Sequence, residues 1–128
     1  MVKGIESIMF FSEDADALSE FYKEKVGLEV DFEGEMGEKN ESVYIFKIKD
    51  GSGFGIMGHS KVKGKNKEPE RIMINFEVDD IEKEVKKLHD AGVKRIQNIY
   101  HVEDYGLIAT FEDIDGNYFQ LVQVKESE

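Results

Sequence analysis

Short apolar runs alternate along this chain with acidic clusters and glycines, and their spacing indicates which runs form strands. Residues 5–11 and 72–78 are rich in large and β-branched apolar residues, so each run predicts a strand. An acidic cluster follows each run, then apolar residues at helical spacing and a glycine, which is typical of a capped helix. The other predicted strands cover 28–32, 42–49 and 53–58 in the first half and 93–100, 106–112 and 118–124 in the second. Each half therefore predicts one strand, one helix and three further strands.

The two halves also repeat each other residue by residue. Phe10 matches Phe76 and Asp14 matches Asp80 at an offset of 66. At an offset of 65 the matching pairs are Gly27 with Gly92, Phe46 with Phe111, Asp50-Gly51 with Asp115-Gly116, and Phe54 with Phe119. A single-residue deletion in the second helix explains the change of offset. Because order and spacing are kept along almost the whole chain, we interpret it as a duplication.

The duplication predicts an α+β fold of two βαβββ modules, at 1–58 and 71–128, joined by a linker at 59–70 within a single 128-residue domain. One half alone would expose an apolar sheet face and is not expected to be stable by itself. The modules, paired within one chain or swapped between two, are expected to form a cupped mixed sheet with helices on the outer face. A ligand would then lie in the cleft that the modules form.

Composition narrows the classes of partner. The chain has no cysteine, which excludes disulfides, thiolate zinc sites and cysteine nucleophiles. A net charge of −11 repels phosphate backbones, so we expect no nucleic-acid partner and a preference for cationic ligands. Without an apolar signal segment or membrane span, a cytoplasmic protein with no membrane partner is expected. Lysines at 61, 63, 65 and 67 mark the linker as a solvated connection or, alternatively, as a lid or patch for an anionic group.

With this duplication and the motifs below, the chain resembles the vicinal-oxygen-chelate superfamily. This superfamily contains glyoxalase I, extradiol dioxygenases, and fosfomycin- and bleomycin-resistance proteins. In the first half the resemblance is carried by Asp14, Phe21-Tyr22 and Gly27-Leu28. In the second half it is carried by Val78-Asp79-Asp80, Tyr105-Gly106 and the run from Phe111 to Leu121. The resemblance covers nearly the whole chain and implies the paired-module fold.

The resemblance also implies where a metal would bind, because metal-using members take one ligand from the first and last strand of each copy. The corresponding positions here are Ser7, Gly55, Met73 and Gln120. They offer one hydroxyl, one thioether and one neutral amide, whereas a hard divalent ion prefers carboxylate, imidazole or several oxygen ligands. We therefore expect no metal and no other cofactor at the family site.

Strand alternation predicts which residues line the cavity. The candidate ligand-binding residues are Ser7, Met9, Gly55, Met57, Met73, Asn75, Tyr105 and Gln120. Methionine adapts to varied ligands, although it also fills irregular cores, and the polar members either orient a ligand or pair with one another or with water. Gly55 is expected to leave space where metal-using relatives place a side chain.

A displaced catalytic site is the alternative. His59 opens the linker, and His101 and Glu103 are expected in a loop before the penultimate strand. Together they would make a substitute metal or acid/base site, with zinc, nickel or manganese as the ion.

The preferred hypothesis is a metal-independent protein of the bleomycin-resistance type that sequesters a small organic ligand, with an affinity for cations. It would act as a homodimer or as a paired-module monomer. The second hypothesis is a glyoxalase-type lyase or related enzyme that uses the displaced metal site. The third is an interaction module whose cavity is filled by its own side chains.

Overall fold

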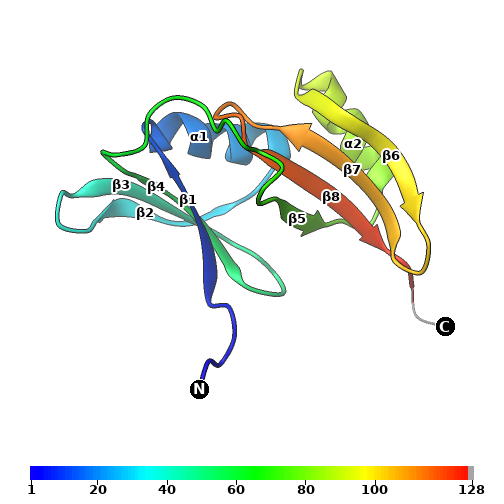
Figure 1. The fold of residues 1–128 in the computed structure, drawn as a ribbon, viewed down its shortest axis with the longest axis horizontal. Coiled ribbons are helices and arrows are strands. Elements are labelled where there is room, and N and C mark those ends of the chain that lie inside the picture. Colours follow the sequence, from blue (N-terminus) through cyan, green and yellow to red (C-terminus); the bar gives the residue numbers. More distant parts are fainter. Residues whose placement is uncertain (127–128) are drawn as a thin grey trace. The chain divides into compact units, whose positions relative to one another are not determined.

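The computed structural model describes residues 1–126, which divide into two compact units. The first unit is Met1–Gly64 and the second is Lys65–Glu128, so the division falls inside the range expected to be the linker. Each unit contains one four-stranded mixed sheet and one helical segment (Figure 1). This agrees with the α+β fold predicted from the repeat.

The first unit contains β1 Ser7–Ser12, α1 Ala15–Phe21, a π-helical turn η1 at Tyr22–Val26, β2 Val30–Met36, β3 Glu41–Phe46 and β4 Gly53–Gly58. The strand order is β1-β4-β3-β2, so β2 is an edge strand. β1 runs parallel to β4, and the other neighbours are antiparallel. The parallel pair is possible because α1 and η1 form part of the connection between the distant strands.

The second unit repeats this topology with β5 Ile74–Glu77, α2 Ile81–Asp90, β6 Lys94–Val102, β7 Gly106–Glu112 and β8 Tyr118–Val124. Its strand order is β5-β8-β7-β6, with β5 parallel to β8. The bounds predicted for β4, β7 and β8 agree with the structure, and the other strands begin or end up to four residues away from their predicted bounds. No helix within residues 1–126 is long and apolar enough to cross a membrane.

Equivalent residues begin and end the helical segments of the two units. The Asp14 side chain accepts a hydrogen bond from the N–H of Ala17 at 3.0 Å, and Asp80 accepts one from Lys83 at 3.2 Å. Each carboxylate satisfies a backbone donor that the first helical turn leaves unpaired. Gly27 has φ of 89°, a left-handed conformation that favours glycine.

The repeated phenylalanines form the same aromatic cluster in each unit, between the sheet and its helix. In the first unit the ring centroids of Phe10 and Phe54 are 5.1 Å apart, and Phe46 stacks on Phe54 at 5.6 Å. In the second, Phe76 and Phe111 lie 6.1 and 5.8 Å from Phe119. The sequence repeat is therefore a repeat of core positions.

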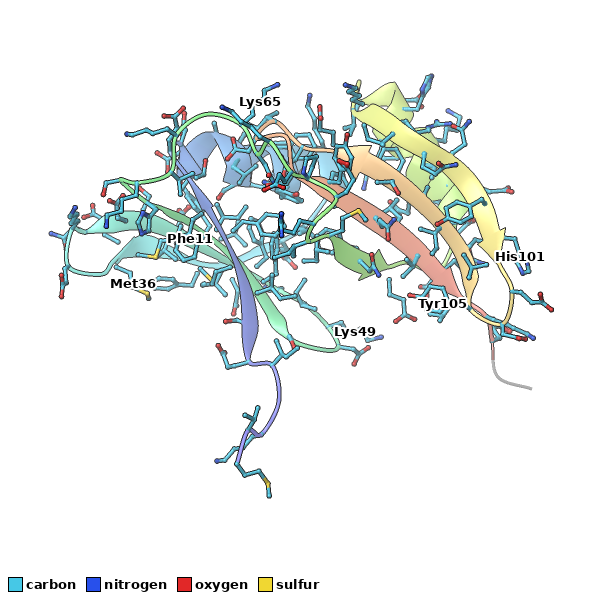
Figure 2. The ribbon with its side chains drawn as sticks, viewed as in Figure 1. Phe11, Met36, Lys49, Lys65, His101 and Tyr105 are labelled. Carbon is cyan, nitrogen blue, oxygen red and sulfur yellow. The ribbon has the colours of Figure 1, made fainter. Side chains whose placement is uncertain are left out.

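The lysine-rich segment is hydrogen-bonded at Gly64 and Asn66, on either side of Lys65. The N–H of Gly64 donates to Glu13 within the first unit. In the second, Asn66 donates from its backbone to Asp115 at 2.8 Å and from its side chain to Asn117 at 3.0 Å. Lys65 lies between these anchors (Figure 2). The structure therefore shows a segment with defined hydrogen bonds at the predicted solvated connection.

Candidate functional site

The first sheet has one face packed on its helix and one face free of it. Phe10 contacts the Tyr22 ring on the helix side, so alternation turns Met9 and Phe11 to the other side, the helix-free face. On the neighbouring strand β4, Met9 pairs with Gly55 and Phe11 pairs with Met57. The structure thus brings together Met9, Gly55 and Met57, as alternation predicted.

The space beside Gly55 is occupied. A Cβ atom placed on Gly55 would lie 2.7 Å from the Met9 sulfur and 2.8 Å from the Cδ1 atom of Ile45, both closer than real contacts allow. The expectation that Gly55 leaves space where metal-using relatives place a side chain was therefore wrong. The glycine instead lets two apolar side chains close over the strand, and neither is a ligand for a hard cation.

Apolar side chains remain accessible around this packed centre. Phe11 is 43% exposed and Met36 is 49% exposed (Figure 2). Phe11 also meets His59 edge to face, with ring centroids 5.7 Å apart. The Nδ1 atom of His59 accepts a hydrogen bond from the backbone of Lys61 at 3.1 Å. His59 thus supports the turn after β4 as well as this apolar surface.

The helix-free face of the second sheet carries a polar row instead. Gln97, Thr110, Gln120 and Asn75 are register neighbours across β6, β7, β8 and β5. The Gln120 amide donates to the Thr110 hydroxyl at 2.9 Å. Gln120 is thus paired with Thr110, which is not one of the polar residues predicted to line the cavity. Asn75 and Gln97, at positions next to this pair, are exposed.

The four positions implied for a metal do not fit one. Ser7 is exposed, Gly55 is covered by Met9 and Ile45, Met73 precedes β5, and Gln120 donates to Thr110. None of the four contributes a carboxylate or an imidazole. Within residues 1–126, no group of three or more His, Cys, Asp or Glu side chains is arranged to hold a metal ion. The donor chemistry therefore opposes a hard divalent cation at the family position.

One residue of the displaced-site hypothesis, His101, is placed differently from expectation. His101 lies in β6, not in a loop, because the strand continues to Val102. It pairs with Leu107, which shares the helix side of β7 with Ala109 and Phe111, so His101 lies on the opposite side from Gln120. Glu103 and Tyr105 lie in the following turn, and Tyr105 is 37% exposed (Figure 2).

The described residues of the first unit also enclose a hollow that none of the predicted site residues lines. It lies beside α1 and the edge strand β2, has a volume of about 380 Å³, and includes Asp16, Glu20, Asp31 and Glu33 in its wall. The sequence contains one signal for it. Two carboxylates stand one helical turn apart in α1, and the acidic residues of β2 follow a short distance later.

Comparison with known proteins places this geometry in a family. The family model described as Glyoxalase/Bleomycin resistance protein/Dioxygenase superfamily matches residues 4–121. The uncharacterized protein YetH of Bacillus subtilis (strain 168) is 28% identical over 94% of this chain and 98% of its own length.

Two solved structures show the same fold at lower identity. TnmS3, an antibiotic-binding protein from Streptomyces sp. CB03234, is 19% identical with a TM-score of 0.73, covering 97% of this chain and 98% of its own. The fosfomycin resistance protein FosX from Listeria monocytogenes is 18% identical with a TM-score of 0.73, covering 98% and 96%.

Proposed function

Because the chain belongs to the glyoxalase, bleomycin resistance protein and dioxygenase superfamily, we propose that it binds a small organic molecule without the help of a metal ion. The observation that carries this proposal is the packing at Gly55. A metal-ligating side chain there would have to displace the Met9 sulfur and the Ile45 methyl group, which lie 2.7 and 2.8 Å from the position of its Cβ atom. The other three implied positions supply no charge to compensate for desolvating an ion.

The helix-free face of the first sheet is the proposed binding surface. Phe11 and Met36 are accessible there, and Met9 and Met57 are partly accessible beside them. Flexible thioethers next to an aromatic ring suit the apolar part of varied ligands. TnmS3, with the same fold, is described as an antibiotic-binding protein, which supports binding of an organic molecule. The acidic charge of −11 favours a ligand that carries a positive charge.

Native mass spectrometry of the untagged protein, combined with a thermal-shift screen, tests the proposal. We expect metal-free protein to be stabilised by aromatic amphipathic compounds, with cationic members of the panel most effective, and to be unaffected by chelator. Stoichiometric zinc, nickel or manganese retained at neutral pH would overturn it. The same spectra report subunit number and so test the proposed homodimer.

A matched pair of variants locates the surface. Phe11→Ala removes an exposed ring from the proposed face, and we expect it to weaken binding of the best compound about tenfold. Ile114→Ala removes an apolar side chain of the same 43% exposure from the turn between β7 and β8, and should leave binding unchanged. Equal losses in the two variants would show that the face is not the site.

One observation favours a second candidate, an interaction module without a ligand. Met9 and Ile45 fill the position where a family member would hold a ligand side chain, as expected of a cavity closed by its own residues. This candidate predicts that no compound in the screen shifts the unfolding temperature and that purified protein retains no small molecule.

A further inference from the structure

The hollow between α1 and β2, called here the acidic cavity, lies on the helix side of the first sheet and is separate from the proposed ligand-binding face. Asp16 and Glu20 come from α1, and Asp31 and Glu33 come from β2. Its volume of about 380 Å³ falls within the usual range for small-molecule sites. All of these residues belong to the first unit.

The carboxylates of the acidic cavity are not neutralised by the protein's own cations. Lys23 also lines the cavity, but within residues 1–126 no ion pair of 4.0 Å or less joins it to any of the four acids. The wall therefore carries four negative groups against one positive group. Such an excess attracts positively charged ligands, most strongly where solvent is partly excluded.

The pKa of Tyr44 reflects the same negative environment. Its hydroxyl donates to Asp16 at 2.6 Å, and this hydrogen bond, followed by burial and by the charges of Asp16, Glu33 and Glu20, raises the pKa of Tyr44 to about 12. The neutral phenol therefore stays in the wall at physiological pH. Its ring adds an aromatic surface beside the carboxylates.

Ser19 supplies an independent indication of a missing partner. Its side chain is 2% exposed, it lines the cavity, and its hydroxyl has no hydrogen-bond partner among residues 1–126. A buried hydroxyl without a partner costs free energy, so it calls for an explanation. Val85 of α2 stands at the same distance from the helix cap Asp80 as Ser19 stands from Asp14. Val85 is an apolar core residue. The fold itself therefore does not require a polar group at this position.

Two further positions of the cavity wall also differ in the second unit. At the repeat offset of 65, Tyr44 corresponds to Ala109, and Glu33 corresponds to Asn98. Ala109 is fully buried and has no group that resembles a phenol. The acidic cavity is therefore an addition to the first unit and not a by-product of the repeated fold.

We infer that the acidic cavity binds a small organic cation with two or more amino groups. Ammonium N–H groups would donate to the carboxylates and to the Ser19 hydroxyl oxygen, and the methylene chain would lie against the Tyr44 ring. A bare divalent ion is disfavoured because no three acidic or histidine side chains in residues 1–126 converge closely enough to hold one.

Titration of the full-length, metal-free protein with spermidine at low ionic strength tests the inference. The variant Glu20→Gln/Glu33→Gln removes two cavity charges, and its control, Glu24→Gln/Glu35→Gln, removes two charges that do not line the cavity, one from η1 directly after α1 and one from β2. We expect spermidine affinity to fall about fivefold in the first variant and less than twofold in the control. Equal losses would mean attraction by net charge alone and would overturn the inference, as would no binding to the unmodified protein.

A second pair of variants tests for a gain in spermidine affinity instead of a loss. Its result does not depend on whether the first pair of variants folds stably. Lys23→Gln removes the only positive side chain in the cavity wall among residues 1–126 and should raise spermidine affinity about threefold. Lys25→Gln removes the same charge two residues further along, where it does not line the cavity. An equal gain in both variants contradicts a defined site. Because Phe11→Ala leaves this cavity intact, failure of the proposed ligand-binding face and failure of the acidic cavity are separate results.

Discussion

The two units have the same topology and equivalent aromatic cores, but they differ on both faces of their sheets. The helix-free face of the first sheet presents Met9, Phe11 and Met57, whereas the corresponding face of the second carries Thr110 and Gln120 in a hydrogen-bonded row. On the helix side, the first unit has the acidic cavity and the second has buried Ala109 and Val85 at the matching positions. The repeat is thus retained at the phenylalanines of the core and is lost on the helix-free face and at the acidic cavity.

The largest expected effect comes from the core positions that the units share. Phe54 and Phe119 are 1% and 0% exposed, and each lies at the centre of its aromatic cluster. Replacing either one by alanine should lower the free energy of unfolding by about 3–5 kcal/mol, because a large cavity is left behind. Urea unfolding measures both free-energy losses. Because the chain has no tryptophan, unfolding is followed by far-UV circular dichroism. A cost below 1 kcal/mol in one unit would show that the two cores are not equivalent.

A smaller effect is expected where the helix-free faces differ. Gly55→Ala forces the Met9 sulfur and the Ile45 methyl group to move, since both lie under 3.0 Å from the new Cβ atom. We expect a loss of about 1 kcal/mol, limited because both atoms are ends of flexible side chains. Met9→Ala in the same protein should remove part of that loss, which a double-mutant cycle measures. Additive losses would mean that the two residues do not compete for this space.

The smallest effect on stability is expected at Tyr44, which has no counterpart in the second unit. Its folded pKa of about 12 lies above the ordinary value of 10.0, so its stabilising contribution is complete below pH 10 and is lost as the pH rises through 12. The difference in unfolding free energy between the unmodified protein and Tyr44→Phe should therefore shrink over this interval. Asp16→Asn should move the pKa of Tyr44 toward 10, as measured by ultraviolet titration of tyrosinate. An unchanged titration would show that the 2.6 Å contact is not the main cause.

Residues with a local role were predictable. Asp14 and Asp80 cap helices through donors three residues away, and Gly27 ends a helical segment at positive φ. The bounds of β4, β7 and β8 followed from alternation and the Asp-Gly turns. The place of His101 was not predictable in this way, because β6 continues two residues beyond the apolar pattern through pairing with β7.

The candidate site was predictable only in part. Alternation predicted that Met9 and Gly55 share one face of their sheet and that Asn75 and Gln120 share one face of theirs, and the strand register agrees, because side-chain direction follows strand parity. It did not show that Met9 and Ile45 fill the space at Gly55, since that depends on rotamers from two neighbouring strands. The acidic cavity escaped prediction because Asp16 and Tyr44, 28 residues apart, meet only once α1 packs on β3.

The amino-acid sequence by itself determined the duplicated βαβββ topology, the helix caps and the core phenylalanines, because these depend on local conformation and on burial periods of 2 and 3.6 residues. Only the tertiary structure decided which volumes are filled, that the Ser19 hydroxyl has no partner among residues 1–126, and that the cavity carboxylates form no ion pair there. Those outcomes depend on close packing between side chains from different elements, where a shift of one ångström separates a contact from an open space.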